Sequence, residues 1–277
     1  MYEDRILNED LRKKVVSVEE AGALIKSGMT FATSGFAAGY PKAFPQELAA
    51  HSKATGVRML SAVSNSESMD GHIARSDVLG FHGFFQDNRD MRHAVNEGRI
   101  DFVDCHLGLL ADKIRHGDYG KIDYLVFEAL SVDVDGSLAP VCAAGIDDVF
   151  LEAADKVIVE INVNYPTILD GFCDFGRDME KLTSPAVRLG GTHVPCPPEK
   201  IAAIFFTDLP PDMASYRPVD DVYKAIGDNI VEVLNSEIAA GRLEKNFTFQ
   251  SGVGGVANAV LTDLIQSGFK DLRMYSE

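Results

Sequence analysis

Basic residues are scarce in this chain. Its 26 lysines and arginines face 42 aspartates and glutamates, which gives a formal net charge of −16. A surface of this sign repels nucleic acid and anionic membranes, so neither is expected as a partner. The same surface gives no general attraction to phosphorylated ligands. A site for a phosphate would therefore have to be local or come from elsewhere.

Cysteines and long apolar runs are also few. The four cysteines form no CxxC pair, and in 277 residues this favours reduced thiols, partly in the core. No apolar run approaches the ~20 residues that span a bilayer. The polar, acidic start from Met1 to Asp10 lacks the basic-then-apolar pattern of a signal peptide. We therefore expect a cytoplasmic protein without a membrane segment.

Several familiar motifs are missing as well. The histidines show no metal-ligand spacing, and Cys105-His106 has no second pair, so no metal site is predicted. Asp104 and His106 remain candidates for groups near a pocket. The GxSxG elbow of serine hydrolases is absent, because Ser251 in QSGVG lacks the preceding glycine.

The loop Ser34–Lys42 has glycines after a strand, but their spacing is not GxGxxG and Pro41 interrupts the expected helix start. A dinucleotide site is therefore a weak alternative to a strand-to-helix turn. Such a turn would need a positive φ at Gly35 or Gly39.

The chain alternates strand-like and helix-like segments. Apolar patterns predict strands at 29–33, 57–63, 102–104, 124–129, 156–161 and 201–207. Ser17 and Glu20 form a capping-box pattern, and Asp220–Gly241 is the clearest helix. The proline-rich stretch 164–198 is predicted as a long loop. We expect an α/β fold with an open, mostly parallel sheet flanked by helices, as one domain over 1–277.

Two carboxylates stand out. Glu128 lies in an apolar run, so it must be paired or sit at a strand end. Glu277 follows a predicted strand, downstream of the glycine-rich helix entry Gln250–Gly255. Free backbone N–H groups at such an entry suit an anion. A carboxylate in this position can act as a base, a metal ligand or a nucleophile.

The sequence resembles the acetyl-CoA hydrolase/transferase family, which includes succinyl-CoA:acetate CoA-transferases, and the resemblance runs almost end to end. The segments that carry it are 34–36 with 39–42, 104–107, 127–129 with 135–136, 155–162, 200–204, 250–253 with 256–260, and Tyr275-Ser276-Glu277. The last two groups are the most specific. The resemblance implies a CoA-transferase domain of the NagB/RpiA-like type. It also implies a C-terminal half, with most of the CoA contacts, that these residues do not contain.

The resemblance further implies an acyl-CoA:carboxylate CoA-transferase that works through a glutamyl–CoA thioester. Glu277 matches the nucleophile, and the backbone N–H of Val253, beside Gly254, matches one arm of the oxyanion hole. CoA would enter as substrate, with small carboxylic acids as partners, in a homodimer. The expected substrate-binding residues are Ser34, Gly35, Phe36, Gly39, Tyr40, Ser64, Asn65, Gln250, Ser251 and Gly252.

Two other functions stay open at this point. One is an acyl-CoA hydrolase of the same family, and the other is a fragment that binds ligand without turnover. We expect the 277 residues alone to be inactive. The segment Thr207–Ser215 contains no arginine, although some relatives carry one there that could grip a dicarboxylate, which weakens a succinyl-CoA assignment.

Overall fold

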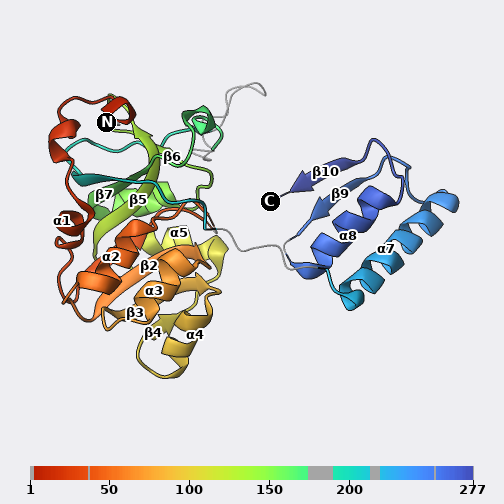
Figure 1. Ribbon diagram of the computed structural model, residues 1–277, viewed down its shortest axis with the longest axis horizontal. Coiled ribbons are helices and arrows are strands. Elements are labelled where there is room, and N and C mark those ends of the chain that lie inside the picture. The colour runs from red at the N-terminus through yellow and green to blue at the C-terminus, as the bar shows by residue number, and fades with distance from the viewer. Residues whose placement is uncertain (1–2, 37, 174–189, 213–218, 253, 277) are drawn as a thin grey trace. The chain divides into compact units, whose positions relative to one another are not determined.

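The computed structural model describes residues 3–36, 38–173, 190–212, 219–252 and 254–276 (Figure 1). The chain forms two compact units, Met1–Met213 and Ala214–Glu277, which we call the larger and the smaller unit. Each is described by itself, and the expectation of a single domain over 1–277 stays a prediction. No helix in the described ranges is long and apolar enough to cross a membrane.

The larger unit is built on an eight-stranded sheet with the strand order β4-β3-β2-β1-β5-β7-β8. Every neighbouring pair on this path is parallel, and β6 adds to β5 in the antiparallel direction. The strands are β1 (Thr30–Thr33), β2 (Val57–Ser64), β3 (Leu79–Gln86), β4 (Asp101–Val103), β5 (Ile122–Val132), β6 (Leu138–Pro140), β7 (Ala154–Asn162) and β8 (Ile201–Thr207).

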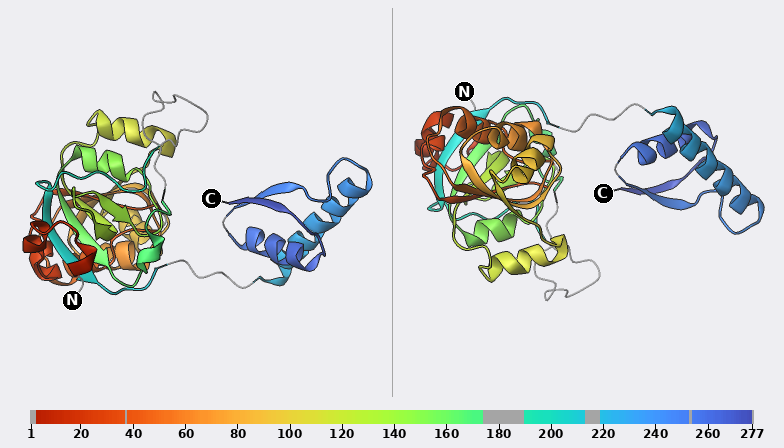
Figure 2. Two further views of the ribbon diagram at one scale, coloured as in Figure 1. Left: turned by 90° about the horizontal axis from the view of Figure 1, so that it is seen from above. Right: turned by 90° about the horizontal axis from the view of Figure 1, so that it is seen from below.

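Helices cover both faces of this sheet, as Figure 2 shows. One face packs against α1 (Val18–Gly22), α2 (Ala43–His51), α3 (His72–Ala74) and α4 (Arg89–Asn96), and the other against α5 (Leu107–Arg115) and α6 (Asp147–Ala153). Val126 on β5 belongs to the first core, whereas its neighbours Leu125 and Phe127 belong to the second. Burial on both faces explains why these strands are continuous apolar runs. The predicted α/β class is therefore confirmed.

Local signals in the sequence held up well. The capping box is present, with Ser17 Oγ accepting from the Glu20 N–H and the Glu20 carboxylate accepting from the Ser17 N–H. The short 3-10 helices η1 (Glu3–Arg5) and η2 (Leu11–Lys14) precede the capping box, and the π-helix η3 (Glu67–Gly71) follows β2. The predicted long loop holds η4 (Thr167–Leu169), and its part 174–189 lies outside the described residues.

The sequence patterns failed at one end of the sheet. Strand β3 was not predicted, because its run LGFHGFFQ mixes glycine, histidine and a polar end. Strand β4 was predicted as buried, but it forms the edge of the sheet and leaves Phe102 37% exposed. An edge strand has a neighbour on one side only, so its side chains lose cover that a central strand provides.

The smaller unit is a compact βαβ arrangement with one more helix. It contains α7 (Asp221–Ala239), β9 (Thr248–Ser251), α8 (Gly255–Gln266) and β10 (Arg273–Ser276), and the two strands are parallel. Helices α7 and α8 pack closely where a Cβ on Gly227 would lie 2.0 Å from Asp263 Oδ2. The apolar stripe of α7 is only partly covered, because Val222 and Val233 stay exposed.

Candidate functional site

The carboxyl ends of the parallel strands gather several predicted site residues in the larger unit. The loop 34–42 follows β1, the turn 64–66 follows β2, and the segment 208–212 follows β8. Open α/β sheets bind ligands at this edge. Tyr40 connects all three segments, because its hydroxyl lies 3.2 Å from Asn65 Oδ1 and 3.0 Å from the Asp212 carbonyl oxygen. The structure thus brings Tyr40 and Asn65 together as expected.

The loop 34–42 is a tight strand-to-helix turn. Gly35 has φ +91°, and a Cβ there would lie 2.3 Å from the Ala38 carbonyl oxygen. Gly39 has φ +69°, and a Cβ there would lie 2.8 Å from the Ala143 carbonyl oxygen. Both glycines are therefore required by backbone angle and by close approach. Helix α2 begins at Ala43, after Pro41.

The first end of this loop is fixed by buried hydrogen bonds. Ser34 Oγ accepts from the Glu128 backbone N–H at 2.8 Å and donates to the Gly39 carbonyl at 3.0 Å. The Gly35 N–H donates to Asp147 Oδ1 at 2.9 Å. Ser34 and Asp147 are buried, while Phe36 is 42% exposed. These bonds fix the backbone at Gly35 and Gly39.

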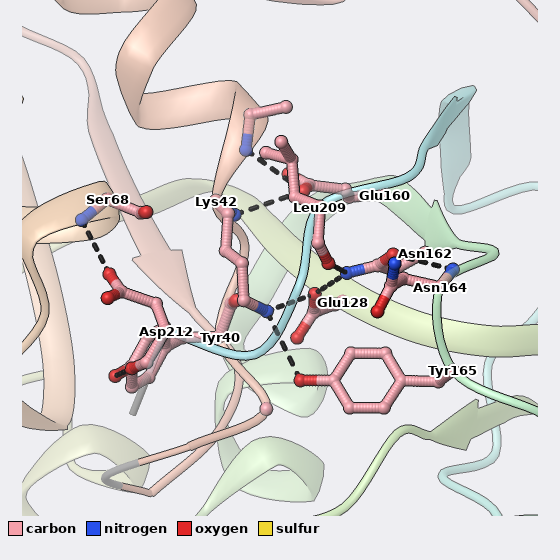
Figure 3. Close-up of polar contacts among 12 residues, drawn as sticks. Tyr40, Lys42, Ser68, Glu128, Glu160, Asn162, Asn164, Tyr165, Leu209 and Asp212 are labelled. Carbon is pink, nitrogen blue, oxygen red and sulfur yellow. Dashed lines mark hydrogen bonds and ion pairs between the residues drawn. The ribbon is translucent and has the colours of Figure 1, made fainter. Parts of the chain in front are cut away.

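The second end of the loop is fixed by Lys42, a lysine that is only 1% exposed (Figure 3). Its Nζ lies 2.5 Å from Glu128 Oε1, and Asn162 Nδ2 donates to the same oxygen at 2.8 Å. The pairing expected for Glu128 is confirmed. The Lys42 and Ala43 N–H groups both donate to Glu160 Oε1 at 3.0 Å. A carboxylate at this helix N-terminus also suits the helix dipole.

Burial changes the acidity of these carboxyls. It raises the pKa of Glu128 to about 7, although the Lys42 charge opposes the shift. It also raises the pKa of Asp147 to about 7, where backbone N–H donors from Gly35 and Gly145 oppose it. The pKa of Glu160 is raised for the same reason. Burial thus disfavours the charged form of all three carboxyls.

A second buried polar group holds the turn after β2. His82 Nε2 lies 3.4 Å from Asp70 Oδ1 and 3.5 Å from Ser64 Oγ, and Asp70 Oδ2 accepts from the Ser66 N–H at 3.1 Å. In a Ser–His–Asp triad the serine and the acid use opposite ring nitrogens. Here both approach the same nitrogen, so this group orders the turn and does not form such a triad. Sequence reasoning missed Asp70 and His82, because no spacing connects them.

The smaller unit carries the other predicted residues. Gln250 and Ser251 end β9, Gly252 follows, and Gly254 with φ +125° precedes the first turn of α8. This turn is largely exposed, and nothing lies within 4 Å of a Cβ on Gly252 or Gly254. The predicted oxyanion donor Val253 and the predicted nucleophile Glu277 lie outside the described residues. Their roles stay predictions.

The remaining candidates lie at the end of β4. Asp104, His106 and Tyr119 line a shallow depression of about 620 Å³, and His106 Nδ1 caps α5 by accepting from the Gly108 N–H at 3.2 Å. Among the described residues, no group of three or more His, Cys, Asp or Glu side chains is placed to hold a metal ion. The depression does not contain Tyr40, Lys42 or Glu128.

Comparison with known proteins defines the class. Residues 2–204 match the acetyl-CoA hydrolase/transferase N-terminal domain. The chain is 37% identical over 288 residues to a succinyl-CoA:acetate CoA-transferase of Clostridium kluyveri, covering 99% of this chain and 54% of the relative. It is 30% identical over 294 residues to an acetyl-CoA hydrolase of Neurospora crassa, covering 99% and 56%.

Solved structures share the fold. RipA from Yersinia pestis superimposes with a TM-score of 0.68 at 18% identity, covering 96% of this chain and 56% of that one. A 4-hydroxybutyrate CoA-transferase from Porphyromonas gingivalis gives 0.56 at 22% identity, covering 97% and 55%. The chain belongs to the acetyl-CoA hydrolase/transferase family. It spans about half the length of the curated relatives that it matches.

Proposed function

We propose that this chain is the N-terminal half of an acyl-CoA:carboxylate CoA-transferase. The observation that carries the proposal is the 37% identity, over 99% of the chain, to a protein named as a succinyl-CoA:acetate CoA-transferase. The hydrogen-bonded residues Ser34, Gly35 and Lys42 at the carboxyl ends of the strands support it, because this is where α/β sheets bind ligands. CoA is a substrate here, and no metal takes part in the proposed chemistry.

The proposed reaction is covalent catalysis by Glu277. Its carboxylate attacks the thioester carbonyl, which forms a mixed anhydride and releases CoA thiolate. The thiolate attacks the glutamyl carbonyl, which forms a glutamyl–CoA thioester and releases the first carboxylate. A second carboxylate reverses both steps and leaves as its CoA ester. Such a sequence gives ping-pong kinetics.

The glycine-rich turns would stabilise the negative charge that develops during the reaction and line the acyl pocket. Each attack creates an oxyanion, and one preorganised N–H donor is typically worth about 3 kcal/mol. The Val253 N–H, beside Gly254, would supply one donor. The loop residues Ser34, Gly35, Phe36 and Tyr40 would line the acyl pocket with Ser64 and Asn65. Most CoA contacts would come from a C-terminal half like that of the longer relatives, within a cytoplasmic homodimer.

We further propose that the acyl group comes from a small monocarboxylic acid. After β8 the described segment supplies Asp208 and Asp212 and no arginine, and Asp212 Oδ2 already accepts from the Ser68 N–H at 2.7 Å. A second carboxylate on the acyl group would meet these acids. This favours a monocarboxylate over a dicarboxylate, because like charges repel at short range.

The decisive variant is Glu277→Ala in the complete protein, meaning residues 1–277 joined to the C-terminal half. We expect transfer activity to fall by several orders of magnitude, because the nucleophile is gone. Glu232→Ala, at an exposed glutamate on α7, is the control and should keep full activity. Retained transfer in Glu277→Ala would contradict the proposal.

A hydrolase is the second candidate, because several relatives carry the name acetyl-CoA hydrolase. In that case water would resolve the acyl or glutamyl–CoA intermediate. Exchange of labelled acetate into acetyl-CoA by the complete protein separates the two functions, since a pure hydrolase should show none. The 277 residues alone should show no turnover, and calorimetry should detect only weak CoA binding. A micromolar affinity of the 277 residues for CoA would contradict the proposal that the C-terminal half makes most of the CoA contacts.

A further inference from the structure

The buried pair Lys42–Glu128 does more than neutralise two charges. The Lys42 ammonium also lies 3.4 Å from the Tyr40 carbonyl oxygen and 3.5 Å from the Tyr165 hydroxyl. It sits 5.8 Å and 5.3 Å from the centroids of these two rings. One cation thus contacts the last residues of the glycine loop, the middle of the sheet and the segment after β7.

Tyr40 links the buried ion pair to two other segments of the chain. Its hydroxyl, held next to Asn65 Oδ1 and the Asp212 carbonyl, connects the turn after β2 with the segment after β8. A hydroxyl has one proton to share between these two acceptors. The position of the Tyr40 ring therefore depends on where Lys42 holds its backbone.

Stability alone is a poor explanation for such a pair. Desolvating both charges offsets much of their attraction, so apolar residues of similar size are often as stable or more so. The Lys42–Glu128 contact is almost completely buried, with side-chain exposures of 2% and 0%. What the ion pair adds over an apolar pair is direction, because its hydrogen bonds fix where the ammonium lies.

We propose that Lys42 and Glu128 are positioning residues: together they hold Tyr40, and through it the loops after β1, β2 and β8, in the arrangement that receives the acyl group. The assignment of an acyl group rests on the proposed function. The holding of the loop itself does not, and the two parts are tested separately.

The first test measures the loop directly. In the 277-residue chain, Lys42→Met together with Glu128→Gln removes both charges with little change in volume. We expect backbone amides in residues 34–44 to exchange with deuterium at least tenfold faster, because the loop loses its second anchor. Lys13→Met with Asp10→Asn removes a pair with side-chain exposures of 79% and 87% and should change nothing. Unchanged exchange in the Lys42/Glu128 variant would overturn the proposal.

The second test measures turnover in the complete protein. The same double variant should keep its melting temperature within a few degrees while kcat falls about 100-fold, the effect expected from a misplacement of about 1 Å. A merely structural pair would lower the melting temperature and leave the kcat of the folded protein unchanged. A kcat within twofold of wild type would overturn the proposal.

Tyr40→Phe keeps the test decisive if the double variant fails to fold. It leaves the buried pair intact and removes only the hydroxyl that bridges Asn65 and Asp212. We expect kcat to fall about tenfold with no loss of folding, and an unchanged kcat would overturn the bridging role. If the wild-type protein transfers no CoA, the proposed function fails, and the exchange measurement alone decides whether the pair holds the loop.

Discussion

The two glycine-rich turns of this chain look alike in sequence but differ in their surroundings. In the larger unit, Gly35 sits where a Cβ would meet backbone at 2.3 Å, and both ends of its loop bond to buried side chains. In the smaller unit, Gly254 also has a positive φ, yet nothing lies within 4 Å of its Cβ position. Only the next residue of this turn, Gly255, is in close contact within the smaller unit, since a Cβ there would lie 2.5 Å from the Tyr223 ring.

This difference suggests different roles for the two turns. In the loop 34–42, buried donors and acceptors hold the backbone of Gly35, Gly39 and Lys42. In the turn before α8 the N-cap residue is Gly254, which has no side chain that could accept from the first helical N–H groups. Uncapped N–H groups at a helix start are suited to an anion or a developing oxyanion. In the proposed function, the first turn would shape the acyl pocket, whereas the second would act on the ligand.

The largest expected effect comes from Gly35→Ala. The variant combines a positive φ with a backbone clash, so we expect the larger unit to lose about 3 kcal/mol of folding free energy. Chemical denaturation of the 277-residue chain measures this loss. A change below about 1 kcal/mol would mean that the loop adapts, and the contrast between the two turns would disappear.

The next effect concerns the acid that holds the Gly35 N–H. Burial raises the pKa of Asp147 to about 7, above its unfolded value, so its folded form keeps a proton that the unfolded form loses. Stability from this group therefore falls as pH rises from about 4 to 7. Asp147→Asn keeps an acceptor for Gly35 without the charge. Relative to wild type, it should gain about 2.5 kcal/mol between pH 5 and pH 8.

Chemical denaturation of both proteins at pH 5, 6.5 and 8 measures how the stability of Asp147→Asn relative to wild type changes with pH. Asp155→Asn, at an exposed aspartate at the start of β7, is the matched control and should show no such trend. A difference between Asp147→Asn and wild type that does not change with pH would show that folding does not raise the pKa of Asp147.

The smallest effects are expected in the turn before α8. Gly254→Ala has the positive φ but no clash, so it should lower the stability of the smaller unit by about 1 kcal/mol. Gly252→Ala has neither feature and should stay within about 0.5 kcal/mol of wild type. Hydrogen exchange in the first turn of α8 compares the two. A large loss in Gly252→Ala would show that this turn is more constrained than its open surroundings indicate.

Sequence patterns predicted the parts that depend on local chemistry. The capping box at Ser17, the helix α7 and the glycine requirement in the loop 34–42 all follow from neighbours within a few residues. The buried strand β5 was equally clear, because burial on both faces leaves an apolar run. The family, too, could be read from short motifs spread along the chain, and the match over residues 2–204 confirms it.

Contacts between distant segments could not be predicted in this way. Glu128 was expected to have a partner, but Lys42 lies 86 residues away, and nothing in its sequence context marks it as buried. The pair Asp70–His82 was missed altogether, since it joins a turn to a strand whose pattern is irregular. The prediction that β4 is buried was wrong, because the residues of a single strand do not show which place it takes in the sheet.

The sequence by itself determined the family, the α/β alternation and the glycines that the turns require, because propensity, capping and backbone angles act over short ranges. Only the tertiary structure decided that Lys42, Glu128 and Glu160 meet at one edge, and that Tyr40 reaches Asn65 and Asp212. The physical reason is that parallel strands bring their carboxyl ends together irrespective of sequence distance. Burial then forces the charged groups collected there to find one another.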